Sequence, residues 1–553
     1  MPLLLRCMWN YSLIPRTNFQ IVFCGLLTAT LLWAGWPSGG MAPLLFIALA
    51  PLLLVEKNIY EQKKKGQRVR LFGYSYLTYV LFNLLTTWWV WFASPFGMVG
   101  AVLANALLMA GVFQVFHWIK LNTGKVFGSI SLVIVWGAFE HLHMDWDLSW
   151  PWLNLGNGFA SWANMVQWYE YTGTLGGTVW IWTSNLIVAE ILTVPDKRKK
   201  PLIIVWTGLI LIPVLLSMKI YGGYEEIHRP VEIVVVQPNV DPYNEKFSGN
   251  SDEQLTRMLT MAAAKATPST KVIVCPETAL PDGIWSEELS SHHQIGTIRQ
   301  FLAQRPSTRL LTGLSYYRYF RPGEALSETA RPFRNGEAHF DAYNAAMQMD
   351  STSNIPLHFK SKLVPGVEKM PFPQLLGFME DFAIDLGGIT GSLGVQDKPA
   401  VFRGDSTYIA PVICYESIYG DYMGEYVRDG ANLICIMTND GWWRDTPGYK
   451  QHCQYARLRA IEHRRSVARS ANTGISCFIG QRGEIQDATA WWTPAVIRRE
   501  LNLNNQLTFY SRFGNILEST FTVLAGIVLT IGALFRYLNY KKQQPAIKKV
   551  DYA

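Results

Sequence analysis

The sequence predicts a polytopic α-helical membrane domain of eight spans joined to a globular α/β domain. The chain has 553 residues, of which 49% are hydrophobic and only 16% charged. This composition is too apolar for an ordinary soluble enzyme, and the length allows more than one domain. Strand-like runs mixed with charged and turn residues separate seven strongly apolar segments from an eighth near the C-terminus. We therefore expect seven spans in residues 1–220, a globular domain in 221–512, and an eighth span with a basic tail in 513–553.

The eight apolar segments are residues 21–36, 41–55, 71–93, 98–119, 126–139, 179–192, 202–218 and 516–535. Several are shorter than the roughly 20 residues that a bilayer span needs, so flanking residues or neighbouring helices must complete them. Basic residues precede the first segment, as in a secretory signal, but no small-residue cleavage site follows it convincingly. We interpret the first segment as a retained anchor.

Basic residues fall on every second connection between these segments. The alternate loops, 37–40 and 94–97, carry no charge. Because cytoplasmic loops accumulate lysine and arginine, this alternation predicts both termini in the cytoplasm and residues 221–512 on the opposite side. It also accounts for the net charge of +7 without a nucleic-acid partner. The basic positions are Arg6, Arg16, Lys57, Lys63, Lys64, Lys65, Arg68, Arg70, Lys120, Lys125, residues 197–200, Arg536, Lys541, Lys542, Lys548 and Lys549.

The loop between the fifth and sixth segments is rich in aromatic side chains. It either forms an interfacial belt or lines a rim through which a lipid reaches the globular domain. Ionisable residues also stand at the end of the fifth segment, where they are functional candidates or simply reach water. The aromatic residues are Trp146, Trp150, Trp152, Trp162, Trp168 and Tyr169, and the ionisable ones are Glu140, His141 and His143.

The globular part alternates strand-like and helix-like patterns, which predicts a sheet covered by helices. Functional residues of such a fold gather at strand ends. The strand-like runs are residues 231–236, 272–275, 310–314, 342–349, 408–413 and 433–437, and the helical patterns are 252–264, 291–303 and 451–470. The basic residues of 451–470 could bind phosphate headgroups, but the pattern favours a structural helix in which Arg459 and Glu462 pair.

Three strand ends carry reactive groups, namely Glu277, Lys360 and Cys414. A cysteine between a strand and a helix start is either a buried core thiol or a nucleophile whose pKa is lowered by helix N-terminal amides. A carboxylate in a confined apolar site can have a pKa raised enough to act as its base. An ammonium group nearby can stabilise the oxyanion formed when a carbonyl is attacked. Together the three groups predict an acyl-transfer site.

Short motifs around these residues resemble the Glu-Lys-Cys triad of the carbon-nitrogen hydrolase, or nitrilase, superfamily. They are CPE ending at Glu277, KSKLVPGVE from Lys360 to Glu368, and CYE from Cys414 to Glu416. A nitrilase-like domain placed between seven spans and a final span resembles the membrane-embedded apolipoprotein N-acyltransferase family within that superfamily. Further similar stretches are QPN at 237–239, PWL at 151–153 and TNDGWW at 438–443. The resemblance covers nearly the whole chain and implies an α-β-β-α sandwich.

The resemblance implies a role for each matching residue. Glu277 is then the general base, Lys360 the oxyanion-stabilising cation and Cys414 the nucleophile, while Glu368 and Glu416 are accessory acids that orient Lys360 and the thiol. Lys362 competes with Lys360, which we prefer because its separation from Glu368 matches the family. Candidate substrate-binding residues are Trp152, Asn439 and Trp442. The chain departs from the family pattern at residues 366–367 and 369–370, which puts substrate handling by this loop in question.

The implied reaction transfers a fatty acyl chain from a membrane phospholipid to the α-amine of the N-terminal diacylglyceryl-cysteine of a lipoprotein. The acyl group passes through a thioester, so ping-pong kinetics are expected. The implied location is the bacterial inner membrane, with the catalytic domain in the periplasm. The sequence contains no metal-ligand or phosphate-loop motif, so we expect no cofactor, metal or nucleic acid, and we expect a monomer.

Two other functions remain possible. A membrane-tethered amidase would use the same triad with water as acceptor, and a non-enzymatic scaffold or transporter would leave the triad unexplained. Among the other cysteines, Cys275 and Cys435 lie in apolar strands and are expected in the core. A bridge between Cys453 and Cys477 stays open.

Overall fold

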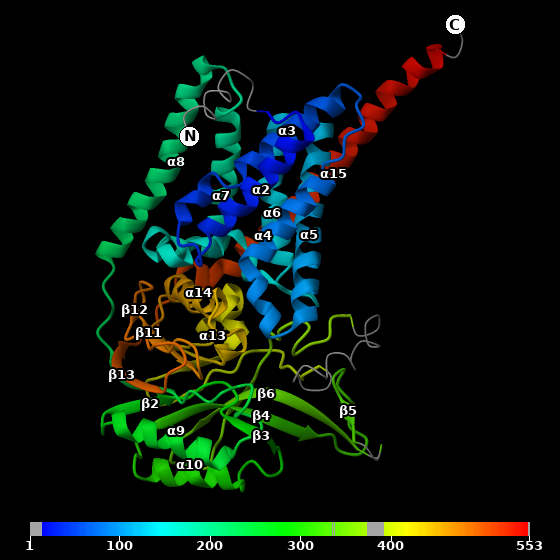
Figure 1. Ribbon diagram of the computed structural model, residues 1–553. Coiled ribbons are helices and arrows are strands. Elements are labelled where there is room, and N and C mark those ends of the chain that lie inside the picture. The colour runs from blue at the N-terminus through cyan, green and yellow to red at the C-terminus, as the bar shows by residue number, and fades with distance from the viewer. Residues whose placement is uncertain (1–13, 334–335, 337, 373–391, 551–553) are drawn as a thin grey trace.

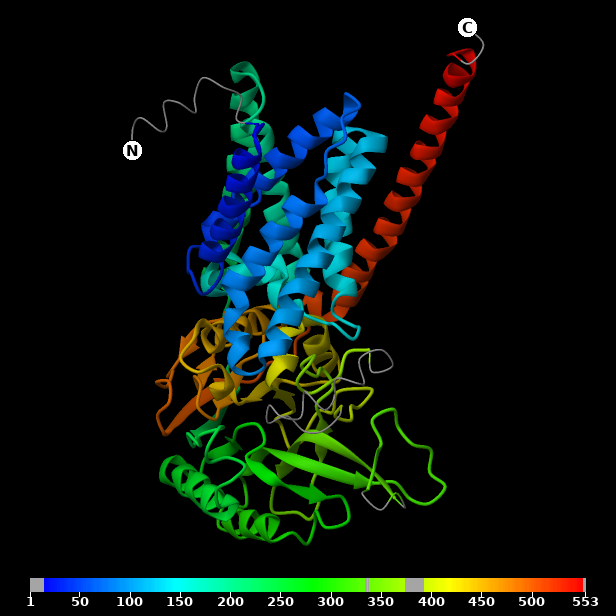
Figure 2. The same cartoon turned by 45° about the vertical axis from the view of Figure 1, so that its right-hand side comes forward.

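The computed structural model describes residues 14–333, 336, 338–372 and 392–550, and only the backbone of 543–550. A helical domain and an α/β domain are stacked end to end, and the long C-terminal helix α15 runs back along the helical domain (Figures 1 and 2). The basic position Arg6 lies outside the described residues.

Each of the eight predicted apolar segments lies on helical structure. The elements are α2 (Asn18–Gly35), η1 (Ala42–Phe46), α3 (Ala50–Lys64), α4 (Phe72–Thr87), η2 (Trp88–Phe92), α5 (Pro95–Thr123), α6 (Lys125–Leu142), η3 (Pro151–Leu153), η4 (Leu155–Met165), α7 (Tyr169–Ile191), α8 (Asp196–Gly223) and α15 (Phe509–Val550). Within the described residues, six helical stretches are long and apolar enough to cross a membrane. Helix α4, with 16 residues, and helix α7, interrupted at Gly173, are not among them. The protein therefore has the helices of a membrane protein, and the count of eight spans stays a prediction.

Local sequence sets the limits of several of these helices. Thr17 caps α2 by accepting from the Gln20 amide, and the Gln20 side chain returns a bond in a capping box. Ser94 caps α5, and Pro95 occupies its first turn, where a missing N–H is harmless. Gly124, with φ +98°, separates α5 from α6. The charge-free loop at 94–97 is thus a helix start.

The globular domain is the predicted four-layer α-β-β-α sandwich. Helices α9 (Ser251–Lys265) and α10 (His293–Ala303) cover the first sheet, and α13 (Gly420–Arg428) and α14 (Pro447–His463) cover the second. The first sheet has strand order β13-β1-β2-β4-β6-β5, with β3 on β4 and β7 on β6, and the second has order β12-β11-β10-β9-β8. The strands are β1 (Pro230–Gln237), β2 (Thr270–Val274), β3 (Leu280–Trp285), β4 (Arg309–Tyr319), β5 (Arg331–Pro332), β6 (His339–Met349), β7 (Leu357–Phe359), β8 (Ile409–Ile413), β9 (Leu433–Thr438), β10 (Val467–Ala471), β11 (Cys477–Ile479), β12 (Ile485–Gln486) and β13 (Ala495–Asn502).

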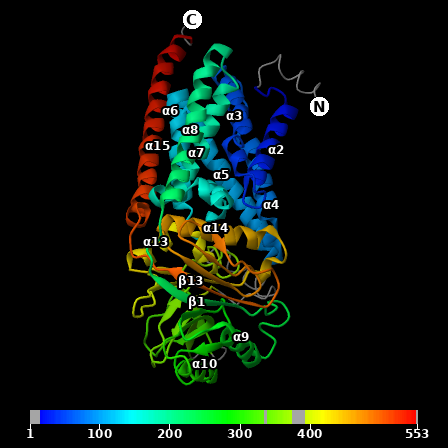
Figure 3. The ribbon, with the colours of Figure 1, turned by 90° about the vertical axis from the view of Figure 1, so that its left-hand side faces the viewer.

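Buried apolar residues fill three spaces in this stack. One set lies between the first sheet and its helices, and another lies between the two sheets. The third set joins α13 and α14 to the helical domain in one continuous core. Helix α14 crosses the end of the helical bundle (Figure 3). The α/β sandwich is therefore packed directly on the helical domain.

Polar bonds reinforce the junction between the two domains. Trp36 Nε1 donates to the Tyr455 hydroxyl at 2.9 Å, and Gln451 Nε2 donates to the Thr86 carbonyl at 3.1 Å. Arg464 pairs with Glu170 of α7 at 2.8 Å. These contacts join α14 and its C-terminal end to three different parts of the helical domain.

All six predicted strands are present, but the predicted helix at 451–470 is too long. Helix α14 ends at His463, and residues 467–471 form β10. Arg464 takes a left-handed conformation with φ +48°, which stops the helix, and the following apolar residues pair in parallel with β9. The predicted pair of Arg459 and Glu462 is present and buried, with Arg459 Nε 2.9 Å from the Glu462 carboxylate. Both residues of this pair are thus structural, as the pattern favoured.

The described cysteines all carry free thiols. Cys275 and Cys435 are buried in strand-end and strand positions, as predicted. Cys453 Sγ and Cys477 Sγ lie 3.8 Å apart, which is a contact between thiols and longer than a disulfide bond of roughly 2.05 Å. The bridge left open by the sequence is not formed in this structure.

Candidate active site

The candidate nucleophile Cys414 occupies a strained corner between β8 and the 3-10 helix η6 (Cys414–Ile418). Its φ is +47°, a conformation that costs a non-glycine residue about 1–3 kcal/mol and often marks functional sites. The side chain is only 9% exposed. Strand β8 pairs in parallel with β9, so Cys414 lies beside Thr438, whose Oγ1 is 3.3 Å from the sulfur.

The predicted acid and lysine residues meet at the ends of the first sheet. Lys360 Nζ lies 3.1 Å from Glu277 Oε1 and 2.7 Å from Glu368 Oε1. Asn344 Nδ2, from β6, donates to the same two carboxylates at 2.8 and 3.1 Å. Glu368 Oε2 also accepts from the Val364 amide at 2.9 Å, which fixes the loop. Lys360 is therefore held between the carboxylates of Glu277 and Glu368.

Glu416 is bonded to backbone amides and to neighbouring side chains. Its carboxylate accepts from the Ile413 and Ser361 amides, both at 2.8 Å, and from the Tyr422 hydroxyl at 3.1 Å. His358 Nε2 lies 3.2 Å away. Glu416 thus ties the strand end that carries Cys414 to the segment that carries Lys360.

The charges of the site differ from the sequence prediction in two ways. Burial and the nearby Glu277 carboxylate raise the pKa of the Cys414 thiol, although Lys360 opposes this shift, so no helix-terminus lowering results. Burial would raise the pKa of Glu277, but the ammonium groups of Lys360 and Lys246 outweigh it and the pKa is lowered. The resting site therefore holds a thiol and an ionised carboxylate.

Sequence reasoning missed a second lysine in this site. Lys246 Nζ donates to the Glu277 carbonyl at 2.9 Å and to Thr278 Oγ1 at 2.5 Å. Burial lowers the pKa of Lys246 to about 8, although Glu277 and Cys414 oppose the shift. Its position in a loop without a strand-end pattern offered little signal, apart from its place shortly after the QPN motif at 237–239.

A buried polar network behind Cys414 was also missed. His452 Nδ1 lies 3.0 Å from Asp440 Oδ1, and Arg469 pairs with Asp440 Oδ2 at 2.7 Å. His452 Nε2 lies 3.2 Å from the Cys414 carbonyl oxygen. The TNDGWW motif contained Asp440, but its partners on α14 and β10 become neighbours only through the fold.

The three candidate substrate residues occupy different surroundings. Trp152 is 1% exposed, donates to Gln451 Oε1 at 2.6 Å and packs among aromatic rings, so it belongs to the packed junction of the two domains. Asn439 is buried and bonds to Asn472 at 3.0 Å. Trp442 is half-buried, and its ring contacts Tyr243 edge-on with centroids 5.3 Å apart. Of the three, Trp442 is the one with a substantially accessible ring.

Lys362, the competitor of Lys360, points elsewhere and pairs with Asp145 at 3.0 Å. Of the ionisable residues at the end of α6, Glu140 is buried and accepts from the Leu155 amide at 2.8 Å and from Thr178 at 2.6 Å. His143 is buried, and its Nδ1 accepts from Trp146 Nε1 at 2.8 Å. Burial lowers the pKa of His143 to about 4, so this ring is neutral near pH 7.

An apolar cavity of about 470 Å³ lies between the helical domain and the Lys360 loop. Trp150 lines it and stacks on Tyr415, the residue after Cys414, with ring centroids 6.2 Å apart. The loop that supplies Glu368 also contributes Val364 and Val367 to its wall. The cavity is lined by Val90, Ala93, Ser94, Phe96, Gly97, Gly100, Ala101, Ala104, Asn105, Leu108, His143, Leu148, Ser149, Trp150, residues 364–367 and residues 370–372.

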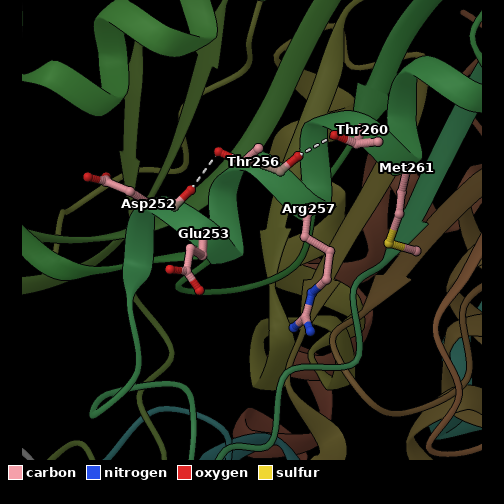
Figure 4. A pocket seen from close by; sticks show the side chains of 6 residues that line it. All are labelled: Asp252, Glu253, Thr256, Arg257, Thr260 and Met261. Atoms are coloured by element: carbon pink, nitrogen blue, oxygen red, sulfur yellow. Dashed lines mark hydrogen bonds between the residues drawn. The ribbon is translucent and has the colours of Figure 1, made fainter.

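A second hollow lies on the outer face of α9 (Figure 4). It is lined by Asp252, Glu253, Thr256, Arg257, Thr260 and Met261, all from one helix. Because one helix face forms it and none of the predicted site residues lines it, we assign it no role in the chemistry.

Both domains of the chain match families of known proteins. Residues 28–187 match the N-terminal domain of apolipoprotein N-acyltransferase, and residues 233–506 match the carbon-nitrogen hydrolase family. A protein of Chlorobaculum tepidum named apolipoprotein N-acyltransferase is 29% identical over 533 residues, covering 94% of this chain and 97% of the relative. A protein of the same name from Geobacter metallireducens is 26% identical, covering 95% of this chain and 97% of the relative.

Among solved structures, a nitrilase-superfamily protein of Saccharomyces cerevisiae is 15% identical to this chain. The match covers 50% of this chain and 92% of the yeast protein, with a TM-score of 0.36. The family matches, by contrast, cover both the helical domain and the catalytic domain, in the same order along the chain. The chain belongs to the apolipoprotein N-acyltransferase family.

Proposed function

We propose that this lipoprotein N-acyltransferase carries the acyl group on Cys414 between two lipid substrates. The donor is a membrane phospholipid, and the acceptor is the α-amine of the N-terminal diacylglyceryl-cysteine of a lipoprotein. Glu277 is the general base, Lys360 stabilises the oxyanion, and Glu368 orients Lys360. The supporting contacts are the two Lys360 carboxylate pairs, at 3.1 and 2.7 Å.

In the first half-reaction, Glu277 takes the Cys414 proton as the sulfur attacks the ester carbonyl of the phospholipid. The negative charge that develops on the carbonyl oxygen faces Lys360, whose ammonium already lies in the site and needs little reorganisation. Collapse of this intermediate breaks the ester C–O bond. The departing alkoxide takes the proton from Glu277 and leaves as a lysophospholipid.

In the second half-reaction, the lipoprotein amine attacks the thioester carbonyl and gives up a proton to Glu277. The C–S bond breaks, an amide forms, and the Cys414 sulfur recovers the proton. A raised thiol pKa does not block this scheme, because proton transfer to Glu277 accompanies attack rather than preceding it. Release of the first product before the second substrate reacts predicts ping-pong kinetics.

The observation that carries the proposal is the apolar cavity beside the site. It extends from helix α5 to Trp150, which stacks on Tyr415 next to the nucleophile. An acyl chain lying there would bring its ester toward the corner that carries Cys414 and Tyr415. A substrate held in this way gains the proximity that a lipid dissolved in the bilayer lacks.

The membrane arrangement is also part of the proposal. The charge alternation supports eight spans, both termini in the cytoplasm of a bacterial inner membrane and the globular domain in the periplasm. The C-terminal tail is basic, consistent with a cytoplasmic end. Domain limits at 220 and 512 and a monomeric state complete the proposal.

A transfer assay separates this function from hydrolysis by a membrane-tethered amidase. The purified enzyme receives a phospholipid with a labelled acyl chain and a diacylglyceryl lipopeptide, and mass spectrometry follows the label. We expect an amide-linked acyl group on the lipopeptide with the wild type, and none with Cys414→Ala. The matched control is Cys435→Ala, which removes a thiol from the neighbouring strand β9 and should retain activity. Label found only as free fatty acid, or transfer by Cys414→Ala, would contradict the proposal.

A further inference from the structure

The hydroxyl group of Thr438 lies between the candidate nucleophile and a buried carboxylate. Thr438 ends β9 and is fully buried. Its Oγ1 is 3.3 Å from Cys414 Sγ and 2.7 Å from Asp440 Oδ1. A hydroxyl has one proton to donate, so it can serve only one of these two neighbours at a time.

While the site is at rest, the Asp440 carboxylate accepts the hydrogen bond that the Thr438 hydroxyl donates. Burial would raise the pKa of Asp440, but Arg469 and His452 outweigh it and hold the pKa below its usual range. Their contacts are direct, at 2.7 Å to Oδ2 and 3.0 Å to Oδ1. An ionised carboxylate can only accept hydrogen bonds, so Thr438 must donate to it. The Thr438 oxygen then presents a lone pair to the Cys414 sulfur.

That arrangement suits a thiol and opposes a thiolate. A neutral S–H group can donate to the Thr438 oxygen, whereas a negative sulfur would face its lone pair. Turning the hydroxyl about its C–O bond removes the conflict without moving a heavy atom. Asp440 loses one bond in that turn but keeps the contacts with His452 and Arg469.

We propose that the Thr438 hydroxyl is a hydrogen-bond switch, which donates to Asp440 while Cys414 is a thiol and to Cys414 Sγ while the sulfur is negatively charged. The switch acts twice in a turnover, as negative charge develops on the sulfur during attack and again as the sulfur leaves the thioester. The inference rests on the proposed function only in taking Cys414 as the nucleophile. No acyl donor is needed to test it.

The first test compares Thr438→Val with Thr438→Ser. Valine keeps the shape of threonine and removes the hydroxyl, whereas serine keeps the hydroxyl. The readout is the rate at which iodoacetamide alkylates Cys414 between pH 6 and 9, localised by peptide mass. We expect Thr438→Val to slow alkylation about ten-fold, the order of a hydrogen bond to a charged group. Thr438→Ser should stay within about three-fold of the wild type.

Other titratable and charged groups near Cys414 must be the same in the Thr438 variants compared. They are Glu277 after β2, Lys246 in the preceding loop, Lys360 after β7, Asp440 after β9, His452 on α14 and the neighbouring phenol Tyr415. The Thr438 substitutions leave all six unchanged. The difference between valine and serine therefore reports the hydroxyl.

The second test removes the Asp440 carboxylate, which competes with Cys414 Sγ for the hydrogen bond from Thr438. In Asp440→Asn, the amide oxygen would face Arg469 and the amide nitrogen would face Thr438. The Thr438 hydroxyl is then free to donate its hydrogen bond to the sulfur. Alkylation of Cys414 should then become faster, the opposite direction to Thr438→Val. Loss of the negative charge alone would also accelerate alkylation, so the same change is made in the Thr438→Val background. We expect Asp440→Asn to accelerate alkylation several-fold more when Thr438 is present.

Three results would overturn the switch. The first is unchanged alkylation in Thr438→Val. The second is slower alkylation in Asp440→Asn as well as in Thr438→Val. The third is equal acceleration by Asp440→Asn in the wild-type and the Thr438→Val backgrounds. If Asp440→Asn does not fold, as judged by its thermal unfolding, the valine and serine pair decides alone. Failure of acyl transfer in the assay above would leave these alkylation results standing, so the two proposals fail separately.

Discussion

At the scale of single residues, the charges of the resting site favour the neutral thiol of Cys414, the proposed nucleophile. The thiol of Cys414 has a raised pKa, and Glu277 has a lowered one. A neutral thiol reacts with electrophiles more slowly than a thiolate does. The site becomes reactive when a bound ester lets proton transfer and attack occur together.

Lys246→Met should change the pH dependence of the reaction in a definite direction. The ammonium of Lys246 helps to lower the pKa of Glu277, so its removal raises that pKa. Glu277 must be ionised to accept a proton, so activity falls as pH falls through this pKa. The acid limb of kcat/KM against pH should therefore move upward by roughly one unit, the lower end of the shifts caused by a nearby opposite charge.

The matched control for this change is Lys271→Met, because Lys271 is exposed on strand β2 a few residues before Glu277. It should leave the acid limb where it is in the wild type. An acid limb of Lys246→Met that coincides with the wild type would show that Lys246 does not tune Glu277.

The motif residues could be predicted from the sequence because each stands at a strand end in a short run of distinctive letters. Glu277, Lys360 and Glu368 meet in the structure as those runs implied. Lys246 and Asn344 could not be predicted, because they lie in a loop and in mid-strand and reach the site only through the order of β1, β2, β4 and β6 in the first sheet. The direction of the pKa shifts depends on that same packing and was wrong for Cys414 and Glu277.

At the scale of secondary-structure elements, Glu416 joins the two segments that carry the reactive groups. It accepts from the Ile413 amide before Cys414 and from the Ser361 amide after Lys360. Both bonds are 2.8 Å long, and the carboxylate is fully buried. The relative position of β7 and β8 at the site therefore depends on one side chain.

Glu416→Gln should lower the free energy of unfolding by about 1–3 kcal/mol, because an amide nitrogen would face a buried backbone N–H. Burial opposes ionisation, but His358 and the backbone amides hold the pKa of Glu416 below its ordinary value. A lowered folded-state pKa contributes stability above the unfolded value, and that contribution is lost as pH falls. The wild type and the variant should therefore converge in acid.

Chemical denaturation in detergent, from neutral pH down to about pH 2, well below the ordinary glutamate pKa of roughly 4.3, measures this difference. Glu253→Gln, at an exposed position of α9, is the control and should unfold like the wild type at each pH. A constant difference between Glu416→Gln and the wild type across that range would contradict an ionic role for Glu416.

Elements with a strong local pattern were predictable. The six buried strand runs are present because continuous apolar residues bounded by turn residues favour a buried strand. Strand β10 was predicted as helix, since the pattern of α14 continues past His463 and only the left-handed Arg464 interrupts it. Short strands such as β5 and β12 depend on pairing with β6 and β11, which the sequence does not display.

At the scale of the whole molecule, the two domains share one core. The helices α13 and α14 of the second sheet pack with the membrane helices, and the cavity lies along the same junction. The helical domain is therefore more than an anchor. It supplies one wall of the space from which the proposed acyl donor enters.

Gly100→Leu should block that space. Gly100 lies on α5, lines the cavity and has no neighbouring atom within 4 Å of an added Cβ. We expect at least a several-fold loss of acyl transfer from phospholipid, with alkylation of Cys414 by iodoacetamide unchanged. Gly111→Leu is the control, since Gly111 lies on the same helix, has similar space and does not line the cavity. Equal acyl transfer by both variants would show that the acyl donor does not use the cavity.

The most direct test of the central claim is the intact mass of the enzyme after incubation with phospholipid alone. Wild-type protein should gain the mass of one acyl chain on Cys414, labile to hydroxylamine as a thioester is. Addition of a diacylglyceryl lipopeptide should remove that mass and transfer it to the peptide amine. An enzyme that transfers the acyl group while Cys414 is never modified would contradict the account.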